Sequence, residues 1–140
     1  GYFNNPTETA SAMPGGGWLR TGDGAVLDED GFVYLKDRIK DMIISGGENV
    51  YPAEVENVLA DYPGVSEVAV IGVADETWGE TVKAIIVPVG TEVPDAGEII
   101  DFARERLAHY KCPTSVEFQS ELPRNATGKV LKNQLRQIYG

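Results

Sequence analysis

An aspartate in a glycine-rich, irregular stretch is the first residue that could bind a ligand. The segment Gly17-Trp18-Leu19-Arg20-Thr21-Gly22-Asp23 ends on this carboxylate, Asp23. An ionised aspartate only accepts hydrogen bonds and offers two oxygens, so it can bind both hydroxyls of a ribose. Capping a turn is the simpler role for such a residue, and the segment alone favours that role over ribose binding.

A run of charges followed by two glycines is the second unusual segment. Five of the six residues in Lys36–Asp41 are charged, and the chain then passes through a short apolar stretch to Gly46-Gly47. An exposed charged stretch can act as a pivot between two parts of a protein, and glycine lets the backbone approach a ligand closely. A solvated linker followed by a β-turn explains the same residues, and composition alone favours it.

The third segment, Leu122–Lys129, has a lysine directly after a glycine in a polar loop. The Lys129 ammonium could contact a phosphate or a carboxylate there. The segment is not a phosphate-binding P-loop, because it lacks the upstream glycine and the strand that leads into such a loop. Most lysines in polar loops are simply solvated, so this residue is informative only together with the other two segments.

These segments lie between regions that predict regular structure. Residues 1–24 are predicted to be loop, and a β-hairpin is predicted around the turn Asp28-Glu29-Asp30-Gly31. The predicted strands are rich in β-branched residues and lie at 42–44, 65–73, 82–89 and 116–118. The predicted helices follow proline, capping or periodicity signals and cover 52–60, 95–109 and 130–138. The pattern predicts an α+β fold, a small three-stranded sheet with flanking helices, preceded by a short hairpin.

The composition excludes several classes of protein. The chain has 140 residues, of which 42% are hydrophobic and 24% charged, enough for one domain with a modest core. Its net charge of -10 repels nucleic acid and anionic membrane surfaces. The single cysteine, Cys112, excludes an internal disulfide and suits a reducing, cytoplasmic location. No apolar run is long enough to cross a membrane, and the polar start without Met favours a piece of a longer protein.

The three segments, taken in their order, resemble the last conserved blocks of one enzyme superfamily. They read Trp-x-x-Thr-Gly-Asp, then Asp-Arg-x-Lys-Asp with Ser-Gly-Gly-Glu-Asn-Val-Tyr-Pro-x-Glu-Val-Glu, then Pro-Arg-Asn-x-Thr-Gly-Lys. The chain is similar, over nearly its whole length, to the acyl-CoA synthetase, nonribosomal adenylation domain and luciferase superfamily. Ile43–Asn49 looks like the fatty-acyl-CoA ligases and their relatives. The resemblance implies the C-terminal domain of an AMP-forming enzyme, in which ATP and a carboxylic acid give acyl-AMP and CoA then displaces AMP.

The resemblance also implies roles at the matching positions. Asp23 corresponds to the aspartate that binds the ATP ribose, and Arg38 to the arginine that assists it. Lys129 corresponds to the lysine that contacts the carboxylate and the α-phosphate during adenylation. Lys40 and Asp41 correspond to the hinge about which the C-terminal domain rotates. The implied requirements of the full-length enzyme are ATP, Mg²⁺ and CoA, and no metal ligand is expected among these residues.

A CoA site is implied as well. Gly46 corresponds to the glycine whose backbone lines the pantetheine tunnel. The full predicted set is Ser45, Gly46, Gly47, Trp78, Tyr110 and Lys111. The two aromatic residues could lie against the CoA adenine, or they could be partly buried core residues. Some relatives carry further basic residues where this chain has Cys112-Pro113-Thr114, which leaves Lys111 as the nearby cation. His109 is predicted to end a helix, and Cys112 to be an inert thiol.

The superfamily's Ser/Thr/Gly-rich phosphate loop and its acyl and adenine pockets do not occur in these 140 residues. Residues 1–38 are therefore predicted to be the tail of a large N-terminal adenylate-forming domain, and residues 39–140 the mobile C-terminal domain. We expect the fragment alone to be inactive, with a fatty acid as the preferred substrate of the full-length enzyme on resemblance alone. Two alternatives stay open: an adenylation domain that loads a carrier protein, and a non-catalytic binding module that reuses the fold.

Overall fold

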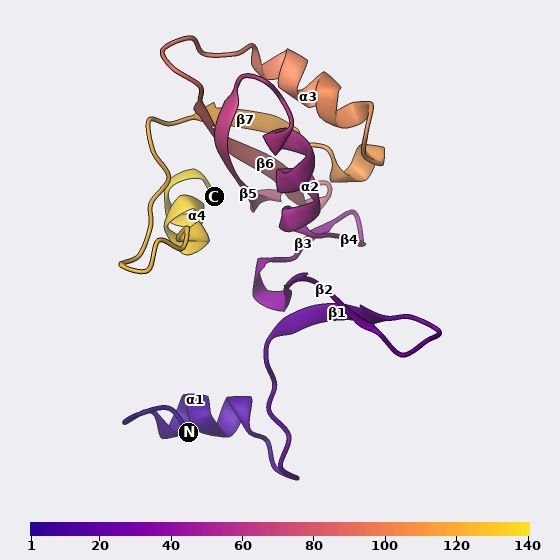
Figure 1. Ribbon diagram of the computed structural model, residues 1–140, viewed down its shortest axis with the longest axis vertical. Helices are drawn as coiled ribbons and strands as arrows, with labels where there is room; N and C mark the ends of the chain where they lie inside the picture. Colours follow the sequence, from indigo (N-terminus) through magenta and orange to yellow (C-terminus); the bar gives the residue numbers. More distant parts are fainter. The chain divides into compact units, whose positions relative to one another are not determined.

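The structure is a computed structural model that describes residues 1–140, and the chain divides into two units, Gly1–Lys40 and Asp41–Gly140 (Figure 1). The first unit contains helix α1 (Pro6–Ala12) and a hairpin of strands β1 (Asp23–Leu27) and β2 (Val33–Arg38). The second unit contains the remaining elements: β3 (Ile43–Ser45), β4 (Glu48–Val50), α2 (Pro52–Ala60), β5 (Val65–Asp75), β6 (Gly79–Pro88), α3 (Ala96–Arg104), β7 (Ser115–Phe118) and α4 (Lys132–Tyr139). No helix is both long and apolar enough to cross a membrane.

The hairpin of the first unit forms where the sequence predicts it. Asp28 closes the turn, because its carboxylate accepts hydrogen bonds from the backbone N–H groups of Asp30 and Phe32. Gly31 has a φ of 85°, a conformation that favours glycine. The bond from Phe32 is also the main cause of the lowered pKa of Asp28.

Two predictions for the first unit are wrong. Residues 1–24 are not all loop: α1 starts at Pro6, and the side chain of Asn5 caps it by accepting the N–H of Glu8. The helix buries no residue, so it has no apolar stripe by which the sequence pattern could reveal it. Lys36–Asp41 is not a linker throughout, since β2 continues to Arg38 and only Ile39–Asp41 forms a short 3₁₀ helix.

The second unit is an α+β fold, as predicted, but its sheet has five strands rather than three. Four strands follow one another in the order β4-β3-β6-β5, and the fifth, β7, lies outside this order and pairs in parallel with β6. The long strands β5 and β6 are antiparallel, and β3 joins β6 at the single pair Ser45↔Gly79. The additional strand β4 exists because Gly46 and Gly47, both at positive φ, turn the chain back onto β3.

Successive side chains of β5 and β6 point to opposite faces of the sheet, so these strands contribute to two hydrophobic cores, one on each face. Helices α2 and α3 cover one face, with Val70 and Ala84 in that core, and α4 packs on the other face, with Ile71 and Ile85 (Figure 1). Leu135 of α4 is fully buried in this second core. Helices thereby cover both faces of the sheet. The packing of α4 also anchors this helix and the loop before it to rigid strands.

The three helices predicted for the second unit are present, but two of them begin or end at other residues than predicted. α2 covers Pro52–Ala60 as predicted, and α4 covers Lys132–Tyr139 rather than 130–138. α3 is capped by Asp95, whose carboxylate accepts the N–H groups of Gly97 and Glu98. It ends at Arg104 rather than His109, and a separate 3₁₀ helix follows at His109–Lys111.

Side chains tie α2, the outer edge of β5 and α4 together. Glu56 of α2 accepts the N–H of Val70 in β5 through Oε1 at 2.8 Å. The same oxygen lies 2.7 Å from the ammonium of Lys132 in α4. Since both side chains of this ion pair are largely buried, it fixes α4 relative to α2 as well as to the sheet.

Candidate functional site

In the first unit, Asp23 and Arg38 form a charged pair at an open cleft. Asp23 begins β1 and Arg38 ends β2, and the register of the hairpin places them opposite each other. Arg38 Nη1 donates to Asp23 Oδ1 at 2.6 Å and to the carbonyl of Thr21 at 3.0 Å. The cleft has a volume of about 620 Å³ and is lined by Leu19, Arg20, Thr21, Gly22, Asp23, Arg38, Ile39 and Lys40. A carboxylate oriented by a guanidinium at such a cleft can accept hydroxyl groups, because each of its oxygens accepts more than one hydrogen bond.

The predicted hinge residues lie where the two units meet in the sequence. Lys40 is the last residue of the first unit and Asp41 the first of the second. Asp41 is buried within the second unit and pairs with Arg136 of α4 at 2.9 Å. Lys40 is exposed. The hinge role of these two residues stays a prediction.

In the second unit, four of the six residues predicted to bind CoA line one pocket. They are Ser45, Gly46, Trp78 and Tyr110. The pocket has a volume of about 180 Å³, and its other lining residues are Glu48, Thr81, Val82, His109, Cys112 and Thr114. The hairpin β3–β4, the start of β6 and the 3₁₀ helix His109–Lys111 surround it. The exposed lining is mainly apolar, and its polar groups are the carboxylate of Glu48, the imidazole of His109 and several hydroxyl groups, a combination found in sites for small molecules.

Gly46 is required by the shape of this pocket. Its N–H donates to the carbonyl of Trp78 at 2.9 Å, and its φ is 59°. A Cβ at this position would lie 2.7 Å from the indole ring of Trp78. The backbone at Gly46 is therefore exposed to the pocket, with the aromatic ring packed directly on it. The neighbouring Gly47 meets no such neighbour and does not line the pocket.

Lys111, which was predicted to bind CoA, forms an ion pair outside the pocket. Its ammonium donates to both carboxylate oxygens of Glu54, at 2.7 and 2.8 Å, and this hydrogen bonding raises the pKa of Lys111. It does not line the pocket. Two residues that the sequence set aside, His109 and Cys112, do line it. Burial raises the pKa of the Cys112 thiol, which agrees with the prediction of an unreactive cysteine.

Lys129 lies on a loop that is closed by its own hydrogen bonds. Asn125 Oδ1 accepts the N–H groups of Thr127 and Lys129 at 3.0 and 2.9 Å, and the N–H of Asn125 donates to the carbonyl of Lys129 at 2.9 Å. Gly128 takes a φ of 83° within this turn. Four cations occur in residues 122–140, and three of them have carboxylate partners: Arg124 with Glu67, Lys132 with Glu56, and Arg136 with Asp41. Lys129, which is exposed, is the one without an ion-pair partner.

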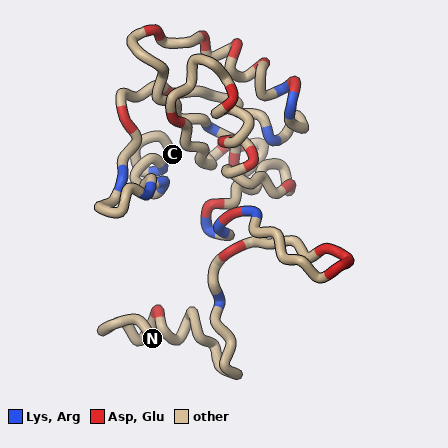
Figure 2. Tube along the Cα trace, viewed as in Figure 1, with Lys and Arg blue, Asp and Glu red and all other residues tan.

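Four of the eight Lys and Arg residues of the second unit lie in residues 122–140. Figure 2 shows them on α4 and the loop before it, with other basic residues at the end of α3 and on the sheet, and with Asp and Glu spread over α3 and the loops beside it. Because the three other cations of this segment are paired with carboxylates, Lys129 is the charge of the segment that can attract an anionic group. No group of three or more His, Cys, Asp and Glu side chains could hold a metal ion. The residues of this chain thus form no cage that would bind a metal ion by protein ligands alone.

Sequence reasoning missed the residues that shape the Lys129 loop. Arg124 and Asn125 stand inside the recognised motif, and an asparagine before Thr-Gly is a turn signal that could have identified Asn125. Glu67 has no sequence signal, because its partner Arg124 is 57 residues away. Thr81 and Thr114 of the pocket were likewise missed.

Comparison with known proteins identifies the family. Residues 54–129, more than half of the chain, match the family model described as the AMP-binding enzyme C-terminal domain. The chain belongs to this family. The match begins within α2 and ends on Lys129, so it includes Trp78 and Tyr110 of the pocket and the loop that carries the lysine.

Individual relatives of this AMP-binding enzyme C-terminal domain are CoA ligases. The chain is 54% identical over 138 residues to the long-chain-fatty-acid–CoA ligase FadD13 of Mycobacterium tuberculosis, covering 99% of the chain and 27% of the relative. It is 51% identical over 140 residues to the feruloyl-CoA synthase of an Amycolatopsis species, covering 100% of the chain and 28% of the relative. The chain therefore spans about a quarter of the length of the curated relatives it matches.

A solved structure agrees with the assignment. The o-succinylbenzoate CoA synthetase of Bacillus subtilis, in complex with its acyl-adenylate intermediate OSB-AMP, matches with a TM-score of 0.88 and 47% sequence identity. The match covers 96% of this chain and 27% of that one. The fold predicted from the sequence, that of an AMP-binding enzyme C-terminal domain, is confirmed.

Proposed function

We propose that the chain is the C-terminal part of an AMP-forming acid–CoA ligase, and that Lys129 is its catalytic residue in the first half-reaction. The observation that carries the proposal is the state of Lys129. It is an exposed cation on a turn fixed by hydrogen bonds, and it is the one cation of its segment without a carboxylate partner. Most lysines in polar loops are simply solvated, so the state of Lys129 supports the proposal together with the order of the three motifs and the family match, which ends on this residue.

In the first half-reaction, a carboxylate oxygen of the acid attacks the α-phosphorus of ATP. The bond from that phosphorus to the bridging oxygen breaks, and pyrophosphate leaves with the electron pair. Negative charge gathers between the carboxylate and the phosphate as they approach, and the Lys129 ammonium offsets it. Asp23, oriented by Arg38, binds the ribose hydroxyls and so holds the nucleotide in place.

In the second half-reaction, the thiol of CoA attacks the acyl carbonyl, and AMP leaves. We assign pantetheine binding to the pocket around Gly46, where backbone and a few hydroxyl groups line an apolar cavity. Lys129 and this pocket have no residue in common. The two half-reactions therefore use different parts of the second unit, and we assign the exchange between them to rotation about Lys40 and Asp41.

The substrate class that we propose is a carboxylic acid, with a fatty acid as the first candidate. The name of the Mycobacterium tuberculosis relative supports a long-chain fatty acid. Relatives of similar identity are named for ferulate and o-succinylbenzoate, so the preference for a fatty acid depends on an experiment. We also propose that residues 1–38 belong with the larger N-terminal domain that binds this acid.

The test uses the full-length protein that contains this chain. Pyrophosphate release is measured over a panel of fatty and aromatic acids for the wild type, Lys129→Ala and Lys129→Gln. We expect a loss of roughly 10²-fold or more in both variants, the size seen when a preorganised charge stabiliser is removed. Arg104→Ala, on the exposed face of α3, is the control and should retain full activity.

A second measurement separates the alternatives. Free CoA and a phosphopantetheinylated carrier protein are compared as acceptors of the acyl group. Transfer only to the carrier protein would indicate an adenylation domain rather than a CoA ligase. Undiminished pyrophosphate release by Lys129→Ala would refute the catalytic role and leave a binding module as the remaining function.

A further inference from the structure

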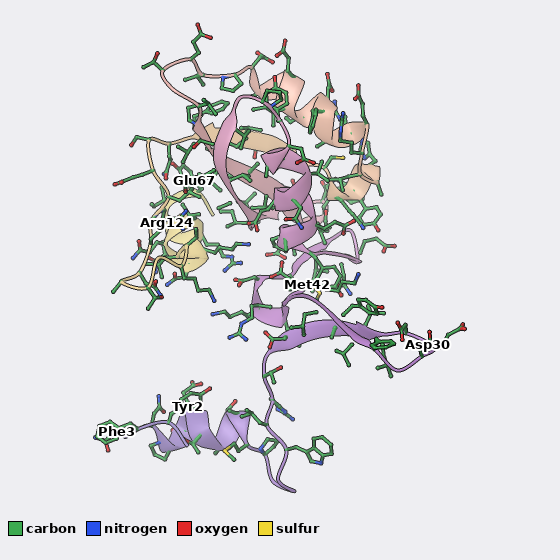
Figure 3. The ribbon with its side chains drawn as sticks, viewed as in Figure 1. Tyr2, Phe3, Asp30, Met42, Glu67 and Arg124 are labelled. Carbon is green, nitrogen blue, oxygen red and sulfur yellow. The ribbon has the colours of Figure 1, made fainter.

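Arg124 connects the loop of Lys129 to a rigid strand. Its Nη2 lies 2.5 Å from Glu67 Oε2, and its Nη1 donates to the carbonyl of Gly128 at 2.6 Å. Figure 3 shows Arg124 on the loop before α4, beside Glu67 at the start of β5. The guanidinium therefore holds the backbone immediately before Lys129 with one nitrogen and the sheet with the other.

The strand end of this connection is well fixed. Glu67 pairs with Val87 of β6 in the antiparallel ladder, next to the register shift between Val65 and Glu67. The neighbouring residues Ala69 and Ile71 are buried under α4. The backbone of Glu67 is thus held in place by the sheet and the core, and the pair with Arg124 connects the loop to this fixed point.

The Arg124–Glu67 pair is poorly placed to serve stability. Its side chains are 43% and 40% exposed, and ion pairs in such surroundings contribute little to folding. The two other pairs of this segment have more buried side chains and hold α4, not the loop. The turn is already closed locally by Asn125, so what Arg124 adds is a fixed location of the whole turn relative to the sheet.

We propose that Arg124 and Glu67 are positioning residues for Lys129 in the adenylation half-reaction. The proposal rests on the proposed function, since it requires Lys129 to act on the acid and ATP. A charge held in place before the transition state needs no reorganisation during the reaction, so it stabilises the transition state more than a mobile one. Without the connection, the turn keeps its internal hydrogen bonds but loses its fixed location.

The experiment compares the two half-reactions of the full-length protein. Acyl-adenylate formation is followed by pyrophosphate release, and thioester formation is followed separately from supplied acyl-AMP and CoA. Arg124→Lys keeps the charge but cannot reach both partners, and Glu67→Gln keeps the shape but not the charge. For each variant we expect acyl-adenylate formation to fall about 10-fold or more, in keeping with the effect of misplacing a catalytic group. Thioester formation from acyl-AMP should stay within about twofold, because the pocket contains neither residue.

A double variant and a matched pair complete the design. Arg124→Lys combined with Glu67→Gln should lose no more activity than the worse single variant, because both act through one connection. Arg104→Lys and Asp101→Asn disrupt another exposed pair, of 2.8 Å on α3, and should leave both half-reactions unchanged. Thermal unfolding of every variant is measured alongside.

The outcomes are distinct. Equal losses in both half-reactions together with a lower midpoint of unfolding would reduce Arg124 and Glu67 to a structural role. Unchanged adenylation in Arg124→Lys and Glu67→Gln, while Lys129→Ala is inactive, would overturn the positioning role and leave the proposed function intact. Full activity of Lys129→Ala would overturn both.

Discussion

Arg136 Nη2 and Asp41 Oδ1 lie 2.9 Å apart and connect the last helix to the first residue of the second unit. The two residues are 95 positions apart in the sequence. Only 12% of the Asp41 side chain is exposed. The carboxylate is therefore removed from water to a degree that requires a partner.

We predict that Arg136→Ala lowers the free energy of unfolding by about 1–2 kcal/mol, between the values for exposed and for buried pairs. The reason is that Asp41 would remain buried without its cation. Urea unfolding followed by circular dichroism measures the change. Arg104→Ala breaks a pair whose side chains are 54% and 71% exposed, and should cost less than about 0.5 kcal/mol. Equal losses in the two variants would show that burial of Asp41 has no energetic consequence.

The two adjacent glycines of the β3–β4 turn provide a matched comparison. Both have positive φ, 59° at Gly46 and 85° at Gly47, so alanine is strained at either position. Only at Gly46 would the new Cβ also meet the Trp78 ring. We predict that Gly47→Ala costs about 1 kcal/mol of stability, whereas Gly46→Ala costs about 1–3 kcal/mol more. Thermal unfolding of the two variants measures the difference, and indistinguishable stabilities would contradict the packing of Trp78 on Gly46.

Trp78 lines the pocket and is nevertheless 57% exposed. The rest of this large ring packs on Gly46, so we predict that Trp78→Ala lowers the free energy of unfolding by about 1–2 kcal/mol. If the full-length protein has the proposed CoA ligase activity and the ring stacks on the CoA adenine, the variant should show a KM for CoA raised about tenfold, since base–aromatic stacking is worth roughly 1–3 kcal/mol. The KM for ATP serves as the internal control. A raised KM for ATP, or an unchanged KM for CoA, would argue against this contact.

Cys112 is 5% exposed, and burial raises the pKa of its thiol above the ordinary value of 9.0. We predict that iodoacetamide modifies the native chain at pH 8 at least about tenfold more slowly than the urea-unfolded chain, because the thiolate is the nucleophile. Mass spectrometry over time measures both rates. Comparable rates would mean that the thiol is accessible in the folded state.

The same shift has a consequence for stability at alkaline pH. The folded state keeps the Cys112 thiol protonated, whereas the unfolded chain ionises it above pH 9.0. The unfolded state then binds fewer protons, so the stabilising contribution is complete below pH 9 and is lost as the pH rises through the folded pKa. As the pH rises above 9, the free energy of unfolding should therefore decrease less in Cys112→Ala than in the wild type. Urea unfolding at several pH values compares the two slopes.

Local signals allowed much of the fold to be predicted. The long strands β5 and β6 show in their β-branched residues, and α2 and α3 begin where Pro52 and Asp95 indicate. The predictions failed where local signals are weak or ambiguous. α1 has no apolar face, and the three residues of β4 were hidden behind a glycine pair that also suits a plain turn.

The parts of the candidate site that lie within one short sequence motif could be predicted. The motif order led to Asp23 with Arg38 and to the loop of Lys129, and the structure brings the first pair into contact. It also places Ser45, Gly46, Trp78 and Tyr110 around one pocket. Partners distant in sequence could not be predicted, because Glu67 meets Arg124, and Glu54 meets Lys111, only through the folded sheet and helices.

The bond from Val70 to Glu56 affects more than the position of α2. β5 is the outermost strand on its side of the sheet, and unpaired backbone groups on such a strand invite strand addition by another chain. At Val70 the outward N–H is already occupied by a carboxylate, and the ammonium of Lys132 lies against the same oxygen. An incoming strand would have to displace a largely buried ion pair before it could form its first hydrogen bond there. At this point the long apolar strand β5 is thereby protected against self-association by two charged side chains.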